Sequence, residues 1–173
     1  MRIEKYEVPE RALSWVVALG MSAYGVGKYV QFQGGYDQNV TLSELSGMQL
    51  MWAFYGYSLN FALIIGFFEL LSAALIFFKK TRLIGCFFLS PILVNIIIQD
   101  IIYEVHLGAL ITALIYQSFV FIIIYFNRSK IYQALKLLFL ARNEYKNRRE
   151  QIISISMSVI LFLTLQFLIF WLI

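Results

Sequence analysis

Long apolar segments dominate the pattern of residues along the chain. Five of them are long enough to cross the hydrocarbon core of a membrane, which takes about 20 residues of helix. They lie near 11–31, 57–78, 83–103, 105–126 and 152–173. Only helices and closed barrels satisfy the backbone in lipid, and these runs are too long and continuous for barrel strands. The pattern therefore predicts an all-α fold, a polytopic membrane helical bundle.

A shorter helix is expected between the first two spans. Thr41 and Glu44 stand at the spacing of a T-x-x-E capping box, which marks the start of a helix. Several aromatic residues follow up to Tyr57, and such rings prefer the membrane surface. We expect a surface helix that anchors the chain, with a lid over a pocket as the alternative.

The segment 128–149 has a different pattern, because its apolar residues recur at helical spacing among many cations. It predicts an amphipathic helix at the membrane interface. An anchor on anionic lipid is the simpler interpretation, and a docking surface for a cytoplasmic partner is the alternative. The cations of this surface include Arg128, Lys130, Arg142, Lys146, Arg148 and Arg149. The chain then divides into a core (1–126), a basic interfacial segment (127–151) and a fifth span (152–173).

Composition supports a membrane protein. Hydrophobic residues make up 61% of the chain and charged residues only 14%, whereas a soluble domain has roughly a quarter of its residues charged. The chain has too few polar side chains to cover its apolar surface, so membrane lipids are its expected surroundings.

The distribution of charge predicts the orientation. All Lys and Arg residues except Lys28 lie in segments that five spans would place on one side of the membrane. Because such residues mark the cytoplasmic side, we expect the N-terminus inside and the C-terminus outside, most simply in a bacterial cytoplasmic membrane. The net charge of +4 then reflects topology rather than nucleic-acid binding.

Several kinds of chemistry are excluded by the residues available. One histidine and one cysteine, Cys86, provide neither a zinc cage nor the two histidine ligands of a bis-histidine haem nor an internal disulfide. Phosphate-binding loops and hydrolase motifs are missing from the sequence. We expect no metal site and no covalently bound cofactor, and His106 is expected to be a solvated loop residue.

Polar residues at membrane depth are the candidate site, because ionisable groups in a bilayer are costly and rarely face lipid. Counting about 1.5 Å of rise per residue places them in two layers. The outer layer contains Lys28, Asn60, Asp100 and Tyr103, and the middle layer contains Glu69, Asn95 and Gln117.

The charges of the outer layer predict an ion pair between Lys28 and Asp100, which have opposite signs and similar depth. A pair between Lys28 and Glu69 looks strained, because the count separates them by more than ~10 Å along the membrane normal. Glu69 itself has two interpretations: an acid that passes protons or bonds a quinone-like carbonyl, or a protonated acid bonded to Asn95 alone. Hydrogen bonding between helices is a sufficient role for Asn60 and Gln117.

Three stretches together resemble the DoxX-like family of small membrane proteins. They are GVGKYV (25–30), the second span with Glu69 followed by Thr81–Arg82 and Gly85, and PILVNIIIQDIIYEV (91–105). The resemblance covers roughly 11–126 and implies a four-helix membrane core. It marks Lys28, Glu69, Arg82, Asn95 and Asp100, with Arg82 at the cytoplasmic end of the third span. The basic segment and the fifth span are additions to the family pattern.

The resemblance implies a membrane subunit of a redox or quinone-linked complex, with a polar intramembrane pocket around Glu69. A protein partner would then supply the redox centre, and quinone or lipid is the expected ligand. The alternative is a non-catalytic lipid-binding or scaffold protein that recruits a partner through its basic C-terminal extension, and a homo-oligomer is open in either case. A channel or transporter is a third class, although the spans contain few polar residues for a water-filled path.

Overall fold

The computed structural model describes residues 6–35, 37, 39–140 and 147–172 of the chain. Over these residues every regular element is helical, as the apolar pattern predicts. The elements are α1 (Glu7–Gln31), the short 3-10 helix η1 (Leu42–Glu44), α2 (Gly47–Tyr57), α3 (Leu59–Phe77), α4 (Arg82–Ile102), α5 (Leu107–Phe126), α6 (Arg128–Leu140) and α7 (Arg148–Leu172).

Four of the described helices are long and apolar enough to cross a membrane: α3, α4, α5 and α7. The protein is therefore a helical membrane protein. The expected first span corresponds to α1, which has 25 residues but is not among these four. Its first turn carries Glu7 and Glu10 and its last turn carries Lys28, which lowers its mean hydropathy.

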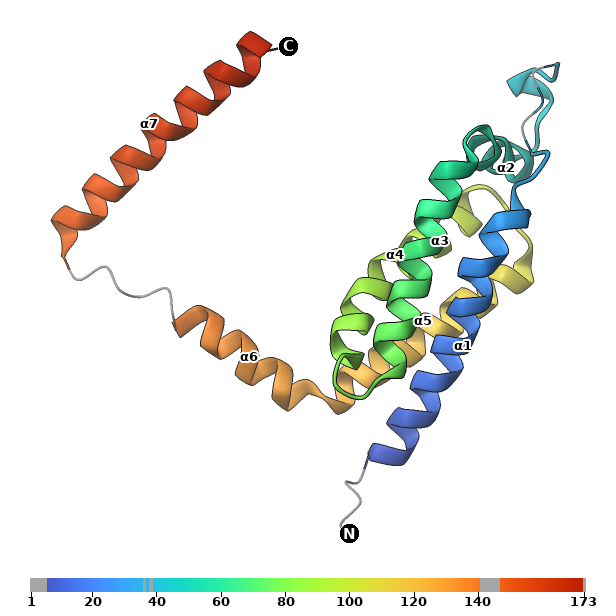
Figure 1. Ribbon diagram of the computed structural model, residues 1–173, viewed down its shortest axis with the longest axis horizontal. Helices are drawn as coiled ribbons and strands as arrows, with labels where there is room; N and C mark the ends of the chain where they lie inside the picture. The colour runs from blue at the N-terminus through green and yellow to red at the C-terminus, as the bar shows by residue number, and fades with distance from the viewer. Residues whose placement is uncertain (1–5, 36, 38, 141–146, 173) are drawn as a thin grey trace. The chain divides into compact units, whose positions relative to one another are not determined.

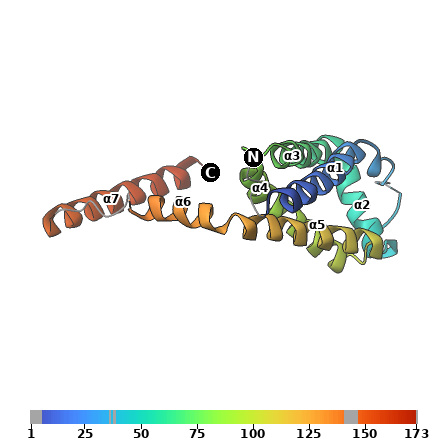
Figure 2. The ribbon, with the colours of Figure 1, turned by 90° about the horizontal axis from the view of Figure 1, so that it is seen from below.

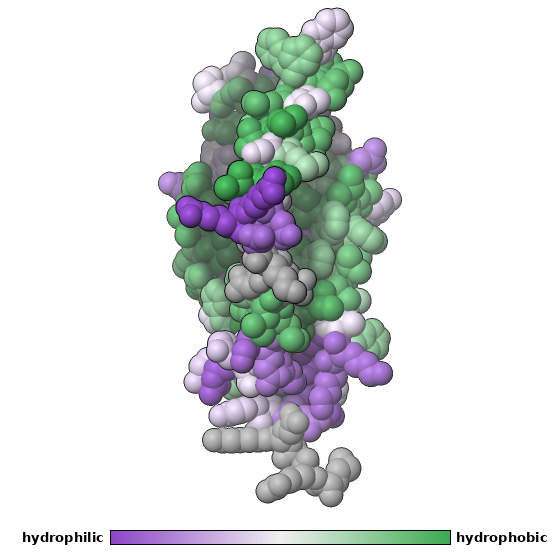
Figure 3. Space-filling model, turned by 90° about the vertical axis from the view of Figure 1, so that its left-hand side faces the viewer, coloured by the Kyte–Doolittle hydropathy of each residue, from purple (hydrophilic) through white to green (hydrophobic). Residues whose placement is uncertain are grey.

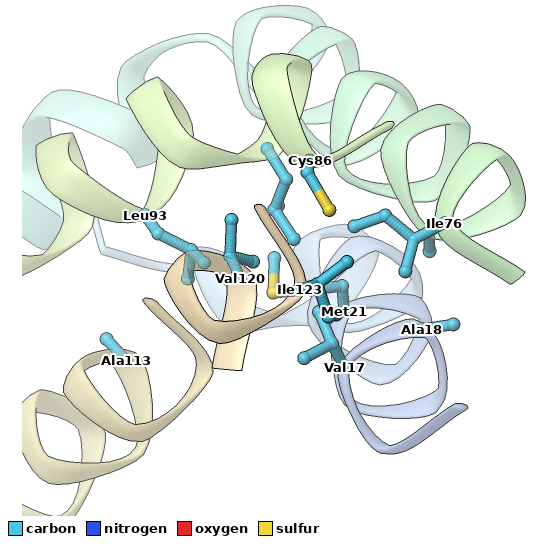
Figure 4. Packing of buried hydrophobic residues seen from close by; sticks show 11 residues of the cluster. Val17, Ala18, Met21, Ile76, Cys86, Leu93, Ala113, Val120 and Ile123 are labelled. Atoms are coloured by element: carbon cyan, nitrogen blue, oxygen red, sulfur yellow. The ribbon is translucent and has the colours of Figure 1, made fainter. Parts of the chain in front are cut away.

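Helices α1, α3, α4 and α5 form a bundle (Figures 1 and 2). Its main core lies between them and consists of small and branched apolar side chains, seen from close by in Figure 4. Val17 and Met21 come from α1, Ile76 from α3, and Leu93 from α4, and none is more than 1% exposed. Cys86 is buried in the same cluster, as expected for a small apolar packing residue.

One end of the bundle is covered by the connection between α1 and α3, which contains α2 (Figure 1). We call it the α2 end. The predicted capping box is present, because the Glu44 carboxylate accepts a hydrogen bond from the Thr41 backbone N–H at 3.1 Å. It starts only η1, however. The longer helix α2 begins after a second box in which Ser46 and Gln49 bond each other's backbone.

The opposite end of the bundle contains the turn between α3 and α4 and the start of α1 (Figure 1). We call it the Arg82 end. Several side chains from this turn bond to α1 and to the final carbonyls of α3. The two ends of the bundle therefore both bring α1 together with the α3–α4 pair, by different contacts.

Residues 129–173 form a separate compact unit. Helix α6 confirms helix formation at the start of the predicted interfacial segment but ends at Leu140. Arg148 and Arg149 lie in the first turn of α7 instead, so the boundary expected between 151 and 152 falls inside that helix. None of the described residues of α7 is buried, and its apolar side chains point outward on all sides. Apolar residues also cover most of the surface visible in Figure 3.

Candidate functional site

The candidate site is built where α1 and α3 cross at two glycines. The helices run in opposite directions (Figure 1). Gly25 on α1 faces Gly66 on α3. A Cβ on Gly66 would lie 2.7 Å from the carbonyl oxygen of Gly25, and one on Gly25 would lie 2.8 Å from that of Gly66. Only residues without a side chain allow so close an approach, as at other membrane helix contacts.

Each glycine is followed three residues later by a charge, and the two charges form an ion pair. Lys28 Nζ lies 3.5 Å from Glu69 Oε1. Lys28 Nζ also donates to Gln31 Oε1 at 3.3 Å and lies 5.4 Å from the centre of the Phe32 ring. Glu69 is 0% exposed and Lys28 is 7% exposed, so the pair is buried within the protein.

The expected pair between Lys28 and Asp100 is wrong, because the ion pair of Lys28 is with Glu69. The depth count put Lys28 and Glu69 too far apart because it measured Cα positions alone. Side chains on a helix tilt toward its N-terminus. In two antiparallel helices these tilts bring the Lys28 and Glu69 side chains toward each other, across about 9 Å of combined rise from the crossing.

A cavity of about 70 Å³ adjoins the pair and is lined by residues of α1, α2, α3, α4 and the start of α5. Four of the predicted residues line it: Lys28, Glu69, Asn95 and Asp100. Its walls also include the aromatic rings of Tyr24, Phe32, Trp52 and Tyr55. We call this the polar cavity, and it fits the lid that was the alternative role of the surface helix, because Met51, Trp52 and Tyr55 all come from α2.

Several buried carboxyl oxygens at this cavity accept no hydrogen bond from a described residue. Among the described residues, both oxygens of Glu69 and the Oδ2 of Asp100 are buried without a hydrogen-bond partner. The Lys28–Glu69 contact of 3.5 Å is an ion pair, longer than a good hydrogen bond. The expected hydrogen bond between Glu69 and Asn95 is therefore not formed, and Asn95 is exposed on one side.

Helix α2 is tied to α4 by a polar contact that was not predicted from the sequence. The Tyr55 hydroxyl donates to Gln99 Oε1 at 3.0 Å and lies 2.8 Å from Gln99 Nε2. Burial raises the pKa of the Tyr55 phenol above its usual range, although the hydrogen bond from Gln99 opposes this shift. The phenol is therefore neutral near neutral pH and keeps the proton that it donates. The sequence did contain a signal for this contact, because Gln99 lies four residues after Asn95 and therefore on the same face of the helix.

The other predicted site residues lie away from the cavity lining. Asn60 is exposed on the first turn of α3, and Tyr103 packs in the small core under α2. Gln117 is buried, and its Nε2 donates to Ser90 Oγ at 2.9 Å. This contact joins α4 to α5, which agrees with the role in helix packing expected for Gln117.

Arg82 forms a second buried ion pair, at the opposite end of the bundle. Its Nη1 lies 2.9 Å from Glu10 Oε1 on α1, and its Nε donates to the Ile76 carbonyl at 3.2 Å. Arg82 is the first residue of α4, at an end of the third span as expected, but its side chain caps the C-terminus of α3, the second span. The bond follows from the free carbonyls in the last turn of any helix.

The predicted basic surface is only partly described. Arg128, Lys130, Arg148 and Arg149 are exposed. Arg128 donates to the Tyr125 carbonyl at 3.2 Å and stacks over the Tyr125 ring. Arg142 and Lys146 lie outside the described residues. His106 is exposed but not free, because its Nδ1 accepts from the Gly108 N–H at 3.1 Å and caps α5.

Comparison with known proteins finds one relative of interest. The chain is 31% identical over 99 residues to the uncharacterized protein YwoB of Bacillus subtilis (strain 168). The match spans 57% of this chain and 64% of that protein, a little under two thirds of its length. No family model matches the chain, and no solved structure is significantly similar to it.

Proposed function

We propose that the protein is an integral membrane subunit of a redox or quinone-linked complex, in which the polar cavity passes protons. The observation that carries the proposal is the buried pair of Lys28 and Glu69 beside a cavity that Asp100 also lines. Ionisable groups at membrane depth that face the interior are typical of proton pathways. The DoxX-like resemblance supports the redox setting of the proposal.

The size of the polar cavity limits what this chain would do in such a complex. About 70 Å³ takes roughly two water molecules at the volume of liquid water. Pockets for drug-sized ligands run to about 300 Å³ or more. A quinone ring would therefore bind outside the cavity, against the partner that supplies electrons, while the cavity passes the protons that quinone reduction consumes.

In the proposed orientation the α2 end faces the outside of a bacterial cytoplasmic membrane and the Arg82 end faces the cytoplasm. Exposed cations on α6 then lie at the cytoplasmic surface, and α7 forms the fifth span. Reporter fusions after residue 140 and at the C-terminus test this arrangement. We expect the first to report the inside and the second the outside; two inside signals would contradict the fifth span.

The proposed function is tested on the complex purified with its partner. Glu69→Gln keeps the shape of the side chain but removes its charge and the ion pair with Lys28 on which the charge balance of the cavity depends. We therefore expect quinone reduction to fall at least about tenfold, within the range for a disabled proton-transfer site. Glu104→Gln is the matched control, because Glu104 is an exposed carboxylate at the same end of the bundle. Normal turnover in Glu69→Gln would end the proposal.

A lipid-binding role is the second candidate, favoured by an apolar groove on the outside of the α2 end. The groove has a volume of about 580 Å³, within the usual range for bound small molecules. Its walls come from η1, α2 and the start of α3, and they include Leu42, Leu50, Ala53, Phe54, Tyr57 and Phe61. Such a groove suits an acyl chain.

Filling the groove tests the second candidate. Ala53→Trp places an indole in the groove, and we expect it to remove lipid that otherwise stays bound to the purified protein in native mass spectrometry. Leu114→Trp adds the same ring to an exposed position of α5 and serves as the control. Equal lipid retention in both variants would contradict this role. Deletion of 129–173, the separate unit, tests in parallel whether that unit recruits a protein partner.

A further inference from the structure

The charges of the polar cavity do not balance. The cavity is lined by two carboxyl groups, Glu69 and Asp100, and by one cation, Lys28. A buried charge without a partner is strongly destabilising, and in membranes ionisable groups are retained when they are paired. One positive charge is therefore missing when both acids are ionised. The smallest species that supplies it is a proton on one of the two acids.

The contacts of the two acids differ, and the difference indicates which one takes the proton. Glu69 Oε1 has the ammonium of Lys28 at 3.5 Å, and it is 0% exposed. The Lys28 stem runs directly past Gly66, where an added Cβ would lie 3.1 Å from Lys28 Cβ and Cγ. The glycine crossing therefore directs the cation to Glu69, which is stabilised as the carboxylate.

Asp100 has no such cation within ion-pair distance in the described part of the chain. Its Oδ2, like both oxygens of Glu69, is buried without a hydrogen-bond partner among the described residues, and the residue as a whole is 5% exposed, so the difference between the acids is the ion pair with Lys28. A carboxylic acid has one donor in addition to its acceptors, so protonation lets that oxygen donate to water in the cavity. The neutral acid is thus the form of Asp100 that suits its surroundings.

The backbone around Asp100 favours the same form. Asp100 lies in the last turn of α4, where the helix dipole is negative and opposes a second negative charge. Its carbonyl accepts the Val105 N–H at 3.0 Å, with Glu104 in the left-handed conformation at φ 51° between them. This is the Schellman arrangement of a helix end, and it fixes Asp100 at the edge of the cavity.

The position of Asp100 also gives it the shorter route to water. It lies two residues from the end of α4, about 3 Å of helix, whereas Glu69 lies ten residues into α3, about 15 Å. Exposed Gln31 and Asn95 line the cavity as well, so it reaches the surface there. A proton that enters from the α2 end reaches Asp100 first.

We propose that Asp100 carries the exchangeable proton of the polar cavity, while Lys28 and Glu69 form a fixed ion pair that keeps the second acid charged. The proposal rests on the proton-linked role above and assigns it to a residue. The ionisable groups that face Asp100 are Lys28 and Tyr24 on α1, Tyr55 on α2 and Glu69 on α3. From α5, Ala109 lines the cavity, and Tyr116 lies behind Tyr24 with ring centres 6.4 Å apart.

Infrared difference spectroscopy of the purified full-length protein tests the assignment, because a protonated carboxyl group has its own C=O band. The chain has only two aspartates, Asp37 and Asp100. Protein labelled with carboxyl-13C aspartate in an Asp37→Asn background therefore reports on Asp100 alone. We expect the acid band that disappears as the pH rises to shift in this sample, and to stay unshifted when glutamate is labelled instead.

Two variants sharpen the result. Asp100→Asn leaves one acid and one cation, so we expect the acid band to be lost. Lys28→Met leaves two acids without a cation, so we expect a second band that shifts with labelled glutamate. A band that shifts only with labelled glutamate in the unmodified chain would place the proton on Glu69, and absence of any acid band while the protein is folded would overturn the charge balance.

This experiment is independent of the test of the proposed function. The spectra need neither a partner nor a quinone, and the turnover measurement needs no assignment of the proton. An aspartate band with normal turnover in Glu69→Gln would keep the assignment and remove the redox role. Loss of turnover together with a glutamate band would keep the redox role and remove the assignment.

Discussion

The bundle holds α1 against α3 and α4 with a buried ion pair at each end, and the two pairs differ in completeness. At the Arg82 end, Arg82 contacts Glu10 at 2.9 Å and the Ile76 carbonyl at 3.2 Å. At the α2 end, Lys28 contacts Glu69 at 3.5 Å beside a cavity and a further acid. The first arrangement satisfies its groups and is structural. The second leaves both oxygens of Glu69 and one oxygen of Asp100 without a hydrogen-bond donor in the described part of the chain.

The residue types suit this division. A guanidinium is planar and always charged, and it donates in several directions at once, so it closes a helix end and binds a carboxylate together. An ammonium on a flexible stem is a compact charge that responds to its surroundings. Placing lysine at position 82 and arginine at position 28 would therefore be expected to destabilise both ends of the bundle.

The largest expected effect is the loss of the Arg82 contacts. Arg82→Met keeps the aliphatic stem but leaves Glu10 and the Ile76 carbonyl without their donor, and we expect a destabilisation of about 3 kcal/mol, typical of a broken buried pair. Reversible unfolding in detergent measures it. Lys79→Met is the control, because Lys79 pairs with Glu7 at the surface, where a pair contributes under about 1 kcal/mol. Equal losses would erase the proposed structural role of Arg82.

The glycine crossing gives the next largest effect. Gly66→Ala forces a methyl group against the Gly25 carbonyl and the Lys28 stem, so we expect a cost of about 2 kcal/mol from overpacking. Gly27→Ala is the matched control, since a Cβ there meets no heavy atom within 4 Å. An alanine at Gly27 should be neutral or slightly stabilising. The same unfolding assay compares the two, and a tolerant Gly66 would contradict the crossing.

A smaller effect is expected when α2 loses its N-terminal cap. The Ser46 hydroxyl accepts from the Gln49 N–H, and removal of such a cap costs about 1 kcal/mol. Ser46→Ala should therefore speed amide hydrogen exchange in α2 by about fivefold while the Arg82 end is unchanged. Ser43→Ala in the exposed η1 is the control. Faster exchange at both ends would mean that the two ends are not independent.

The smallest effect concerns the backbone that positions Asp100. Glu104 has a φ of 51°, which glycine adopts without strain, so Glu104→Gly should stabilise the protein by about 0.5 kcal/mol. Glu104→Gln keeps the strain and should leave the stability unchanged. Thermal unfolding of the two variants makes the comparison, and destabilisation by glycine would contradict the observed conformation.

The sequence predicted the helical membrane fold because apolar runs of span length leave few alternatives. It also selected Lys28, Glu69, Asn95 and Asp100, which all line one cavity. The predicted ion pair between Lys28 and Asp100 was wrong, because the depth of a residue along a helix does not give the direction in which its side chain tilts.

The Arg82 end could not be predicted in detail from the pattern. Glu10 precedes the first apolar run and looks like an ordinary solvated acid, and Arg82 looks like an ordinary cytoplasmic charge. Their contact joins residues 72 apart, which no local spacing reveals. The cap at Ser46 was different, since S-x-x-Q stands in the sequence beside the T-x-x-E that was recognised.

Because α1 and α3 cross in opposite directions at Gly25 and Gly66, the Lys28–Glu69 contact depends on the lengths of the two side chains. The two side chains meet at 3.5 Å, so aspartate in place of Glu69 would keep the charge but draw the carboxylate away from Lys28 by the length of one methylene. In a related sequence with aspartate at position 69, we would expect the lysine at position 28 to form its ion pair with a different acid.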